Sequence, residues 1–145
     1  MKYTIVELKK KYITPGLFST LAHLSSSTVN NVDKGRKQFK RIRKNKNHYI
    51  FVALEKKTRE VIGATTVLIE PKFIHDCGFL AHVEDVVVRP GYEGQGIGRA
   101  LMEKAMKTAQ QADCYRVLLD CHDTNVKFYE KLGFSKRGNE MIHNL

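Results

Sequence analysis

The sequence predicts a mixed α/β fold, in which one sheet carries helices on both of its faces. Short apolar segments of strand length alternate along the 145 residues with amphipathic segments of helical length. Two of the strand-like segments, 49–54 and 61–69, are close enough along the chain to form a hairpin. A third, at 79–88, is joined to an amphipathic helix by a glycine-rich turn. The expected order is β-α-α-β-β-β-α-β-α-β, in a single domain of residues 1–145.

The first half of the chain is expected to contain a strand, two helices and the hairpin. Leu17, Leu21 and Leu24 recur at helical spacing, and Phe39 and Ile42 form the inner face of a second, basic helix. Proline favours the first turn of a helix. The expected bounds are 3–8 for the strand, a start at Pro15-Gly16 for the first helix, about 31–44 for the second, and 49–54 and 61–69 for the hairpin, which Pro71 ends.

The second half is expected to alternate strands and helices. Ile97, Leu101, Ala105 and Ala109 recur every four residues, as on the buried face of a helix. Gly133 suits the left-handed position after a helix. The expected elements are a strand at 79–88 that Pro90-Gly91 stops, a helix at about 97–111, a strand at 115–119, a short helix capped by Asp123 or Thr124, and a final strand from 134 to about 142.

The net charge of +10, from 25 basic and 15 acidic residues, favours anionic partners. Eight basic residues lie between 34 and 46. Such a run usually faces water. The alternative, a nucleic-acid-binding module, lacks interleaved aromatic residues apart from Phe39, so we expect no nucleic acid as a partner.

The cysteines and the N-terminus predict a cytoplasmic protein. The three cysteines are an odd number without metal-ligand spacing, which fits reduced thiols better than a disulfide framework. His75 and His82 have no paired ligand at metal spacing, so no metal site is expected. The N-terminus lacks the apolar core of a signal peptide, and no run of 18 apolar residues is present, so no membrane is expected as a partner.

The glycine-rich turn is the first of the chemistry-bearing segments. Gly94, Gly96 and Gly98 let the backbone approach a ligand, and the helix that follows has unpaired N–H groups at its positive end. The pattern is neither a Walker A loop nor the dinucleotide-binding fingerprint. Three glycines alone also fit a purely structural turn. Their place between an apolar strand and a good helix favours binding of a pyrophosphate.

Acidic residues and a tyrosine in the strand before the turn and in the segments after its helix are candidates for proton transfer. Successive strand residues point to opposite faces, so one of Glu84 and Asp85 faces the interior unless a bulge re-aims the strand. Alternatively, one is exposed and the other is a structural hydrogen-bond acceptor. Asp120 follows a strand, at the end where clefts of open sheets lie. Tyr129 on the next helix either donates a proton to a leaving group or is a core aromatic residue.

These segments, in this order, resemble the GCN5-related N-acetyltransferase superfamily. The acetyl-CoA motif of that superfamily, Arg/Gln-x-x-Gly-x-Gly/Ala, corresponds to residues 93–98, where Glu93 replaces the usual Arg or Gln. Within it, residues 60–142 are similar to the glucosamine-6-phosphate N-acetyltransferases. The similar segments are Lys72-Phe73-Ile74-His75, His82 to Val88, Leu119-Asp120-Cys121 and Asn125 to Phe134.

The resemblance implies a homodimer with shared sites and acetyl transfer from acetyl-CoA to glucosamine 6-phosphate, a step toward UDP-N-acetylglucosamine. We expect the transfer to be direct, in a ternary complex. It implies catalytic roles for Tyr129, Asp120 and Glu84. The cofactor-binding positions that it implies are Val86, Val87, Val88, Gly94, Gln95, Gly96, Ile97, Gly98, Arg99, Asn125, Tyr129 and Lys131. The substrate-binding positions are Ser25, Lys72, Phe73, Ile74, His75, Glu84, Asp85 and Asp120.

One departure from the pattern is Asn144, which lies where yeast-type members of the family carry an arginine that touches the substrate. Lys136, Arg137 or the basic helix are candidates to replace that arginine. An alternative within the same enzyme class is an acceptor amine on a protein or a polyamine. The basic chain, with Lys72 and His75 suited to a phosphate, favours the sugar phosphate.

Overall fold

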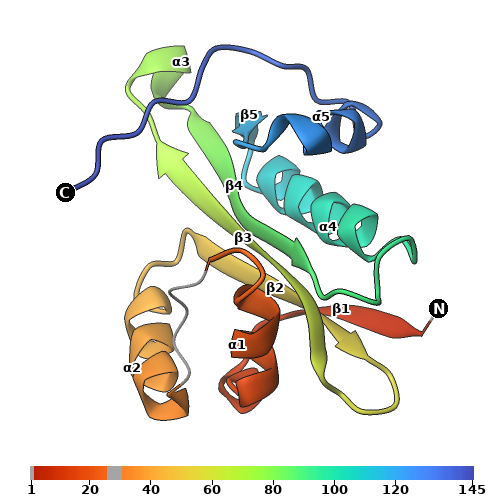
Figure 1. Cartoon of the computed structure of the whole chain (residues 1–145). Coiled ribbons are helices and arrows are strands. Elements are labelled where there is room, and N and C mark those ends of the chain that lie inside the picture. Colours follow the sequence, from red (N-terminus) through yellow and green to blue (C-terminus); the bar gives the residue numbers. More distant parts are fainter. Residues whose placement is uncertain (1, 26–30) are drawn as a thin grey trace.

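The computed structural model of this protein describes residues 2–25 and 31–145 (Figure 1). It contains one mixed sheet with helices on both faces, as predicted. The elements are β1 Tyr3–Glu7, the 3₁₀ turn η1 Lys10–Tyr12, α1 Pro15–Leu21, α2 Val32–Ile42, β2 His48–Glu55, β3 Val61–Pro71, α3 Ile74–Cys77, β4 Phe79–Val88, α4 Ile97–Gln111, β5 Cys114–Leu118 and α5 Asp123–Glu130.

The strands follow one another across the sheet in the order β1-β2-β3-β4-β5. The first four are antiparallel neighbours. Short segments connect β2 to β3 and β3 to β4, whereas η1, α1 and α2 lie between β1 and β2. β5 is parallel to β4, and the connection between them crosses over through α4. The crossover begins with the glycine-rich turn, which connects the end of β4 to the start of α4.

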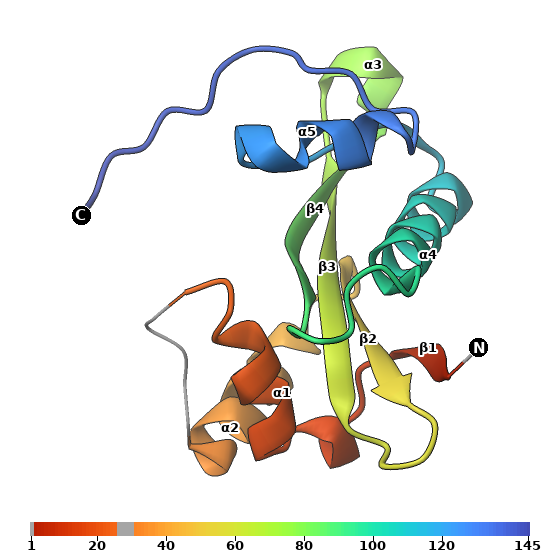
Figure 2. The same ribbon diagram turned by 45° about the vertical axis from the view of Figure 1, so that its right-hand side comes forward.

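Each face of the sheet buries its own apolar cluster. Alternate residues of β2 divide between the two, with Val52 and Leu54 in one cluster and Phe51 and Ala53 in the other. α1 and α2 cover the first face, and α4 covers the second, with α5 above it at one end of the sheet (Figures 1 and 2). The inner face predicted for α4 is confirmed, because Ile97, Leu101, Ala105 and Ala109 are all buried.

A bulge interrupts the pairing of β3 with β4. Ala64 pairs with Val87 and Thr66 pairs with Glu84, so two residues of β4, Asp85 and Val86, lie opposite Thr65. Asp85 takes a left-handed backbone conformation with φ of 54°. The extra residue breaks the alternation of side chains between the two faces of β4, so that both Glu84 and Asp85 are exposed.

Three details of the predicted elements are wrong. Residues 134–142 form no strand, because they pair with no strand of the described ranges 2–25 and 31–145, and the tail runs away from the sheet (Figures 1 and 2). The first helix ends at Leu21 and leaves Leu24 exposed. The N-cap of α5 is His122, which makes no side-chain capping bond, whereas Asp123 lies inside the helix.

Candidate functional site

The edge of β4 becomes free where β4 and β5 diverge. The two strands pair only as far as His82 and Leu118, while β4 continues along β3 to Val88. Within the described ranges, no strand pairs with this edge of β4 between Val83 and Val88. Its backbone N–H and C=O groups are therefore available to an extended ligand that carries amides. Val86, Val87 and Val88 lie on this edge.

The glycine-rich turn leads from β4 into α4. Gly94 and Gly96 have φ of +71° and +80°, a backbone conformation that residues with a Cβ rarely adopt. Gly96 is the N-cap of the 15-residue α4, and no side chain caps the helix there. The first N–H groups of α4, from Ile97 onward, therefore lack a side-chain partner at the positive end of the helix dipole. These groups fit a phosphate or pyrophosphate.

Glu93, the departure from the family motif, bonds within the turn. The N–H of Gly91 donates to Glu93 Oε2 at 2.6 Å, and Gln95 Nε2 is 3.4 Å from the carbonyl of Gly91. Both side chains thus brace the beginning of the turn and leave the start of α4 uncapped. Arg99, one turn further, is exposed and lies 3.9 Å from Glu103.

Acidic side chains gather around the bulge of β4. The pKa of Glu84 is raised, first by partial burial and then by the charges of Asp85 and Asp120; Glu140 of the tail adds to the effect and His82 opposes it. The bulge of β4 and the end of the neighbouring β5 thus bring the predicted residues Glu84, Asp85 and Asp120 into one electrostatic group. A carboxyl group with a raised pKa is a candidate proton acceptor.

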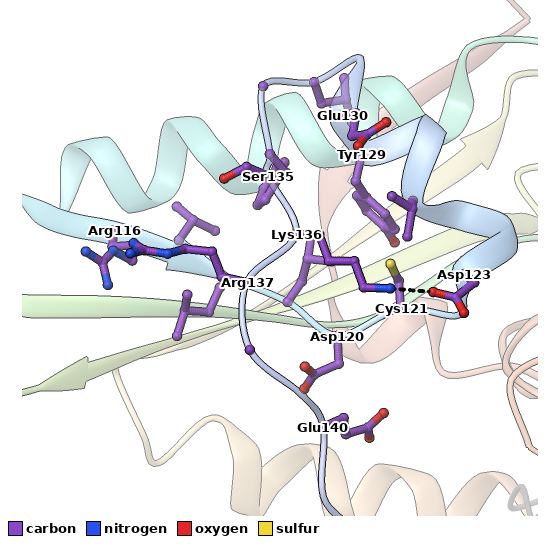
Figure 3. Close-up of a pocket in the computed structure, with 18 of the residues that line it drawn as sticks. Arg116, Asp120, Cys121, Asp123, Tyr129, Glu130, Ser135, Lys136, Arg137 and Glu140 are labelled. Carbon is purple, nitrogen blue, oxygen red and sulfur yellow. Dashed lines mark hydrogen bonds and ion pairs between the residues drawn. The ribbon is translucent and has the colours of Figure 1, made fainter.

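Tyr129 lies in the wall of a cavity of about 640 Å³ between β5, α5 and the tail (Figure 3). Its ring meets Phe128 and Phe134 edge to face, with centroids 4.9 and 6.0 Å apart, and only 8% of the residue is exposed. Burial raises the pKa of Tyr129, and the nearby Cys121 raises it further. The hydroxyl therefore keeps its proton at neutral pH and can donate it.

The tail closes one side of this cavity. Lys136 Nζ lies 2.9 Å from Asp123 Oδ1, at the start of α5, and Figure 3 shows this ion pair beside Cys121. Asp120 and Glu140 lie together at another edge of the same cavity (Figure 3). Glu140 was not expected at the site, because nothing in its local sequence links it to Glu84. The other predicted residues of this region, Asn125 and Lys131, lie in the first turn and at the C-cap of α5.

A second group of predicted residues lies elsewhere in the chain. Lys72, Phe73, Ile74 and His75 form the tip between β3 and β4, at the end of the sheet where Phe79 pairs with Cys114. Asp120 follows the opposite end of β5. Lys72 is linked to the acidic group through Glu70, which also bonds His82, a residue whose charge acts on Glu84. The structure shows no such link for Phe73, Ile74 or His75 within the described part of the chain.

Local contacts fix this tip. Lys72 Nζ donates to Glu70 Oε1 at 2.7 Å, and His82 Nε2 lies 2.9 Å from the other oxygen of Glu70. The ring of His75 packs on Tyr115 at a centroid distance of 4.0 Å. Phe73 is 97% exposed, and Ile74 is exposed beside it. Both apolar side chains are thus available to another molecule.

The remaining observations concern Ser25, metals and membranes. Ser25 is exposed and immediately precedes the segment 26–30, which lies outside the described residues. Over the described ranges 2–25 and 31–145, no three His, Cys, Asp or Glu residues are placed to hold a metal ion. In those same ranges no helix has the length and apolar character needed to cross a membrane.

Comparisons with known proteins agree with this geometry. The model of the acetyltransferase (GNAT) family matches residues 19–134. A glucosamine 6-phosphate N-acetyltransferase of Arabidopsis thaliana is 34% identical over 141 residues, which are 97% of this chain and 91% of the relative. Glucosamine 6-phosphate N-acetyltransferase 1 of Dictyostelium discoideum is 38% identical over 105 residues, which are 72% of this chain and 67% of the relative.

A solved structure is similar along its whole length. The crystal structure of glucosamine-6-phosphate N-acetyltransferase from Arabidopsis thaliana has a TM-score of 0.94 at 30% identity, and the match covers 99% of each chain. The mixed sheet, the diverging strands and the turn before α4 are therefore arranged as in a known acetyltransferase.

Proposed function

This chain belongs to the acetyltransferase (GNAT) family, and we propose that it transfers the acetyl group of acetyl-CoA to the 2-amine of glucosamine 6-phosphate. The products are N-acetylglucosamine 6-phosphate and coenzyme A. The observation that carries the choice of acceptor is the nearly full-length likeness to the Arabidopsis glucosamine 6-phosphate N-acetyltransferase. We place the reaction in the cytoplasm, on the route to UDP-N-acetylglucosamine.

Acetyl-CoA is proposed to lie along the free edge of β4. The backbone of Val86, Val87 and Val88 pairs with its pantetheine amides, and the N–H groups from Gly94 to Arg99 hold its pyrophosphate. Asn125 and Lys131 lie along the outer side of the coenzyme. The unpaired edge and the uncapped start of α4 support this placement.

The reaction is proposed to be direct attack in a ternary complex. Glu84 accepts a proton from the ammonium group of the acceptor, and Asp120 orients the resulting amine. The amine attacks the thioester carbonyl, and a backbone N–H near Val86 stabilises the oxyanion, a type of contact worth about 3–4 kcal/mol. Collapse breaks the C–S bond, and Tyr129 donates a proton to the departing thiolate. The raised pKa values of Glu84 and Tyr129 support these roles.

We propose that the acceptor site is completed in a homodimer. Phe73, Ile74 and His75 follow the end of β3 where Phe79 pairs with Cys114, whereas Asp120 follows the other end of β5, so a second copy is proposed to bring these two groups together. There Lys72 and His75 bind the sugar phosphate, with Phe73 and Ile74 against the other subunit, and Ser25 also contacts the substrate. The exposed apolar side chains on the tip and on the tail support such an interface.

A thiol-release assay tests the function. Purified protein is mixed with acetyl-CoA and, in separate reactions, glucosamine 6-phosphate, glucosamine, spermidine or a basic peptide. We expect free coenzyme A with glucosamine 6-phosphate and much less with glucosamine, because glucosamine lacks the phosphate. Faster release with spermidine or the peptide would assign a cationic acceptor instead and would overturn the proposal.

A further inference from the structure

We infer that Arg89 is a positioning residue for the acetyl-CoA site, because its guanidinium ties the start of the glycine-rich turn to α1 and β3. The inference deepens the proposed donor site and rests on it. Arg89 is not expected to touch acetyl-CoA. It acts through the turn whose N–H groups are proposed to hold the pyrophosphate.

The backbone of Arg89 joins the sheet to the turn. Its N–H donates to the carbonyl of Ile62 at 2.9 Å, which is the last step of pairing between β3 and this part of the chain. Its carbonyl accepts from the N–H of Tyr92 at 3.1 Å and so closes the first bend toward Gly94. The position of Arg89 therefore sets where the turn begins.

The side chain of Arg89 bonds to four acceptors at once. Nη2 lies 2.6 Å from the carbonyl of Val61 and 2.9 Å from that of Gly16. Nε donates to Thr20 Oγ1 at 3.0 Å, and Nη1 donates to Glu60 Oε2 at 2.8 Å. These partners come from α1, from the first residue of β3 and from the residue before it. One planar group thus connects three segments that are distant in the sequence.

Thr20 makes this connection rigid. It is fully buried, and its hydroxyl lies 2.7 Å from the carbonyl of Val61 and 3.0 Å from that of Gly16, the same carbonyls that Arg89 contacts. The hydroxyl hydrogen is directed at these carbonyls, so its oxygen is left to accept from Arg89. Removing one member would leave buried polar groups without partners.

Lysine cannot reproduce this arrangement. Its ammonium is a point charge with three donors, whereas the acceptors here are spaced for the planar fork of arginine. In Arg89→Lys we expect the beginning of the turn to move relative to α1. The N–H groups of the turn are then less well pre-organised for a pyrophosphate, and pre-organisation is a direct source of affinity.

Calorimetric titration with coenzyme A and steady-state kinetics test the inference. For Arg89→Lys we expect the Kd for coenzyme A and the KM for acetyl-CoA to rise about tenfold, with kcat and the KM for glucosamine 6-phosphate within about twofold of wild type. Arg43→Lys is the matched control, since Arg43 pairs with Glu7 on the surface, away from the turn. Glu60→Gln, which keeps the other three acceptors, is expected to have a smaller effect.

The split between the kinetic constants separates positioning from stability. A less stable variant has fewer folded molecules and a lower apparent kcat, but its folded molecules keep the same KM. If Arg89→Lys does not fold, Thr20→Val replaces it, with Thr20→Ser as the variant expected to restore wild-type affinity. An unchanged Kd for coenzyme A in Arg89→Lys, or in Thr20→Val, would overturn the inference. A wild-type protein that gives no heat with coenzyme A would instead overturn the donor site on which the inference rests.

Discussion

At the scale of single residues, Glu84 owes its chemistry to its neighbours. The sequence places it beside Asp85, and an uninterrupted strand would direct the two carboxylates to opposite faces. The bulge leaves both exposed, and the chain then brings Asp120 and Glu140 near them. Partial burial favours the protonated form of Glu84, repulsion among these charges adds to the effect, and together they raise its pKa. A proposed proton acceptor is thus tuned by residues as distant in the sequence as the tail.

The pH dependence of activity checks this proposal. Glu84→Gln is expected to lower kcat/KM about 10²- to 10⁴-fold, the usual contribution of a general base. In the wild type, kcat/KM rises with pH as Glu84 loses its proton. Asp85→Asn removes one of the charges that raise the pKa of Glu84, so it should move this rise to lower pH. Asparagine tolerates the left-handed backbone at this position. An unmoved profile in Asp85→Asn would contradict the assignment of Glu84.

Glu84→Gln should also change the melting temperature, and the raised pKa of Glu84 predicts the direction of that change. The folded state favours the protonated form of Glu84, because its pKa is higher there than in the unfolded chain, where it is near 4.3. Below the unfolded pKa the group is protonated in both states and the fold keeps its full stability. As the pH rises through the folded pKa, Glu84 becomes charged and that stability is lost. The variant should therefore melt at a higher temperature than wild type at pH 7 and at the same temperature below about pH 3.5. A lower melting temperature at pH 7 would mean that Glu84 is stabilised by an attractive contact.

Tyr129 allows a conservative test of proton donation. Tyr129→Phe keeps the ring between Phe128 and Phe134, so the melting temperature should change little, while kcat falls about 10²- to 10⁴-fold. Tyr115→Phe, which keeps an aromatic ring beside His75, is the matched control and should retain full kcat. A Tyr129→Phe enzyme with unchanged kcat at saturating substrates would remove Tyr129 from the mechanism.

At the scale of elements, close approaches between helices decide which small residues are required. Gly35 is buried in the middle of α2, where glycine normally weakens a helix. A Cβ there would lie 2.2 Å from Cζ of Phe18 in α1. The contact between α1 and α2 therefore depends on the missing side chain. This requirement belongs to the packing of two helices and not to the propensity of either one.

Gly35→Ala separates the two effects. Helix propensity alone predicts a gain of about 1 kcal/mol in the free energy of unfolding. The steric clash predicts a loss of about 1–3 kcal/mol, which we expect to dominate because Phe18 is itself buried. Denaturant unfolding measures the net effect. Lys37→Ala on the exposed face of α2 is the control, and Phe18→Leu combined with Gly35→Ala should recover part of the loss. A more stable Gly35→Ala protein would show that α1 and α2 do not pack this closely.

At the scale of the whole molecule, the predicted acceptor site is divided. Asp120 of the acidic group follows the end of β5, and the tip residues Phe73, Ile74 and His75 lie near its beginning. The tail from Ser135 onward pairs with no strand in the part of the chain that the structure describes. Met141 is 92% exposed at its end, and Ile142 is exposed beside it. The proposed homodimer accounts for the divided acceptor site, for the unpaired tail and for the exposed apolar side chains of Met141 and Ile142.

The tail gives a test of that proposal. Changing both Met141 and Ile142 to aspartate should place charges in the interface and convert the protein from a dimer to a monomer, as measured by light scattering after gel filtration. Activity should fall in parallel, because each site then lacks His75 from the other copy. Lys57→Asp, in the exposed segment between β2 and β3, changes the surface charge away from the tail and is the control. A monomeric wild-type protein with full activity would contradict the shared site.

The sequence by itself was sufficient for the elements whose signals are local. The four-residue repeat of α4, the alternation in β2 and the hairpin, and the glycines before α4 depend on neighbouring residues, and these elements formed where they were predicted. The strand predicted from residue 134 failed because a strand needs a partner, and local patterning does not say whether the same chain supplies one.

Only the tertiary structure decided how the candidate site is assembled. The bulge that turns Glu84 and Asp85 outward, the approach of Glu140 and the anchoring of Arg89 by Gly16, Thr20 and Val61 all join residues far apart in the sequence. Burial and Coulomb interactions depend on distance in space, which residue order does not specify. The turn proposed to bind acetyl-CoA could therefore be found from residue types and spacing. The charges around Glu84 and the contacts that hold Arg89 could be found only in the folded chain.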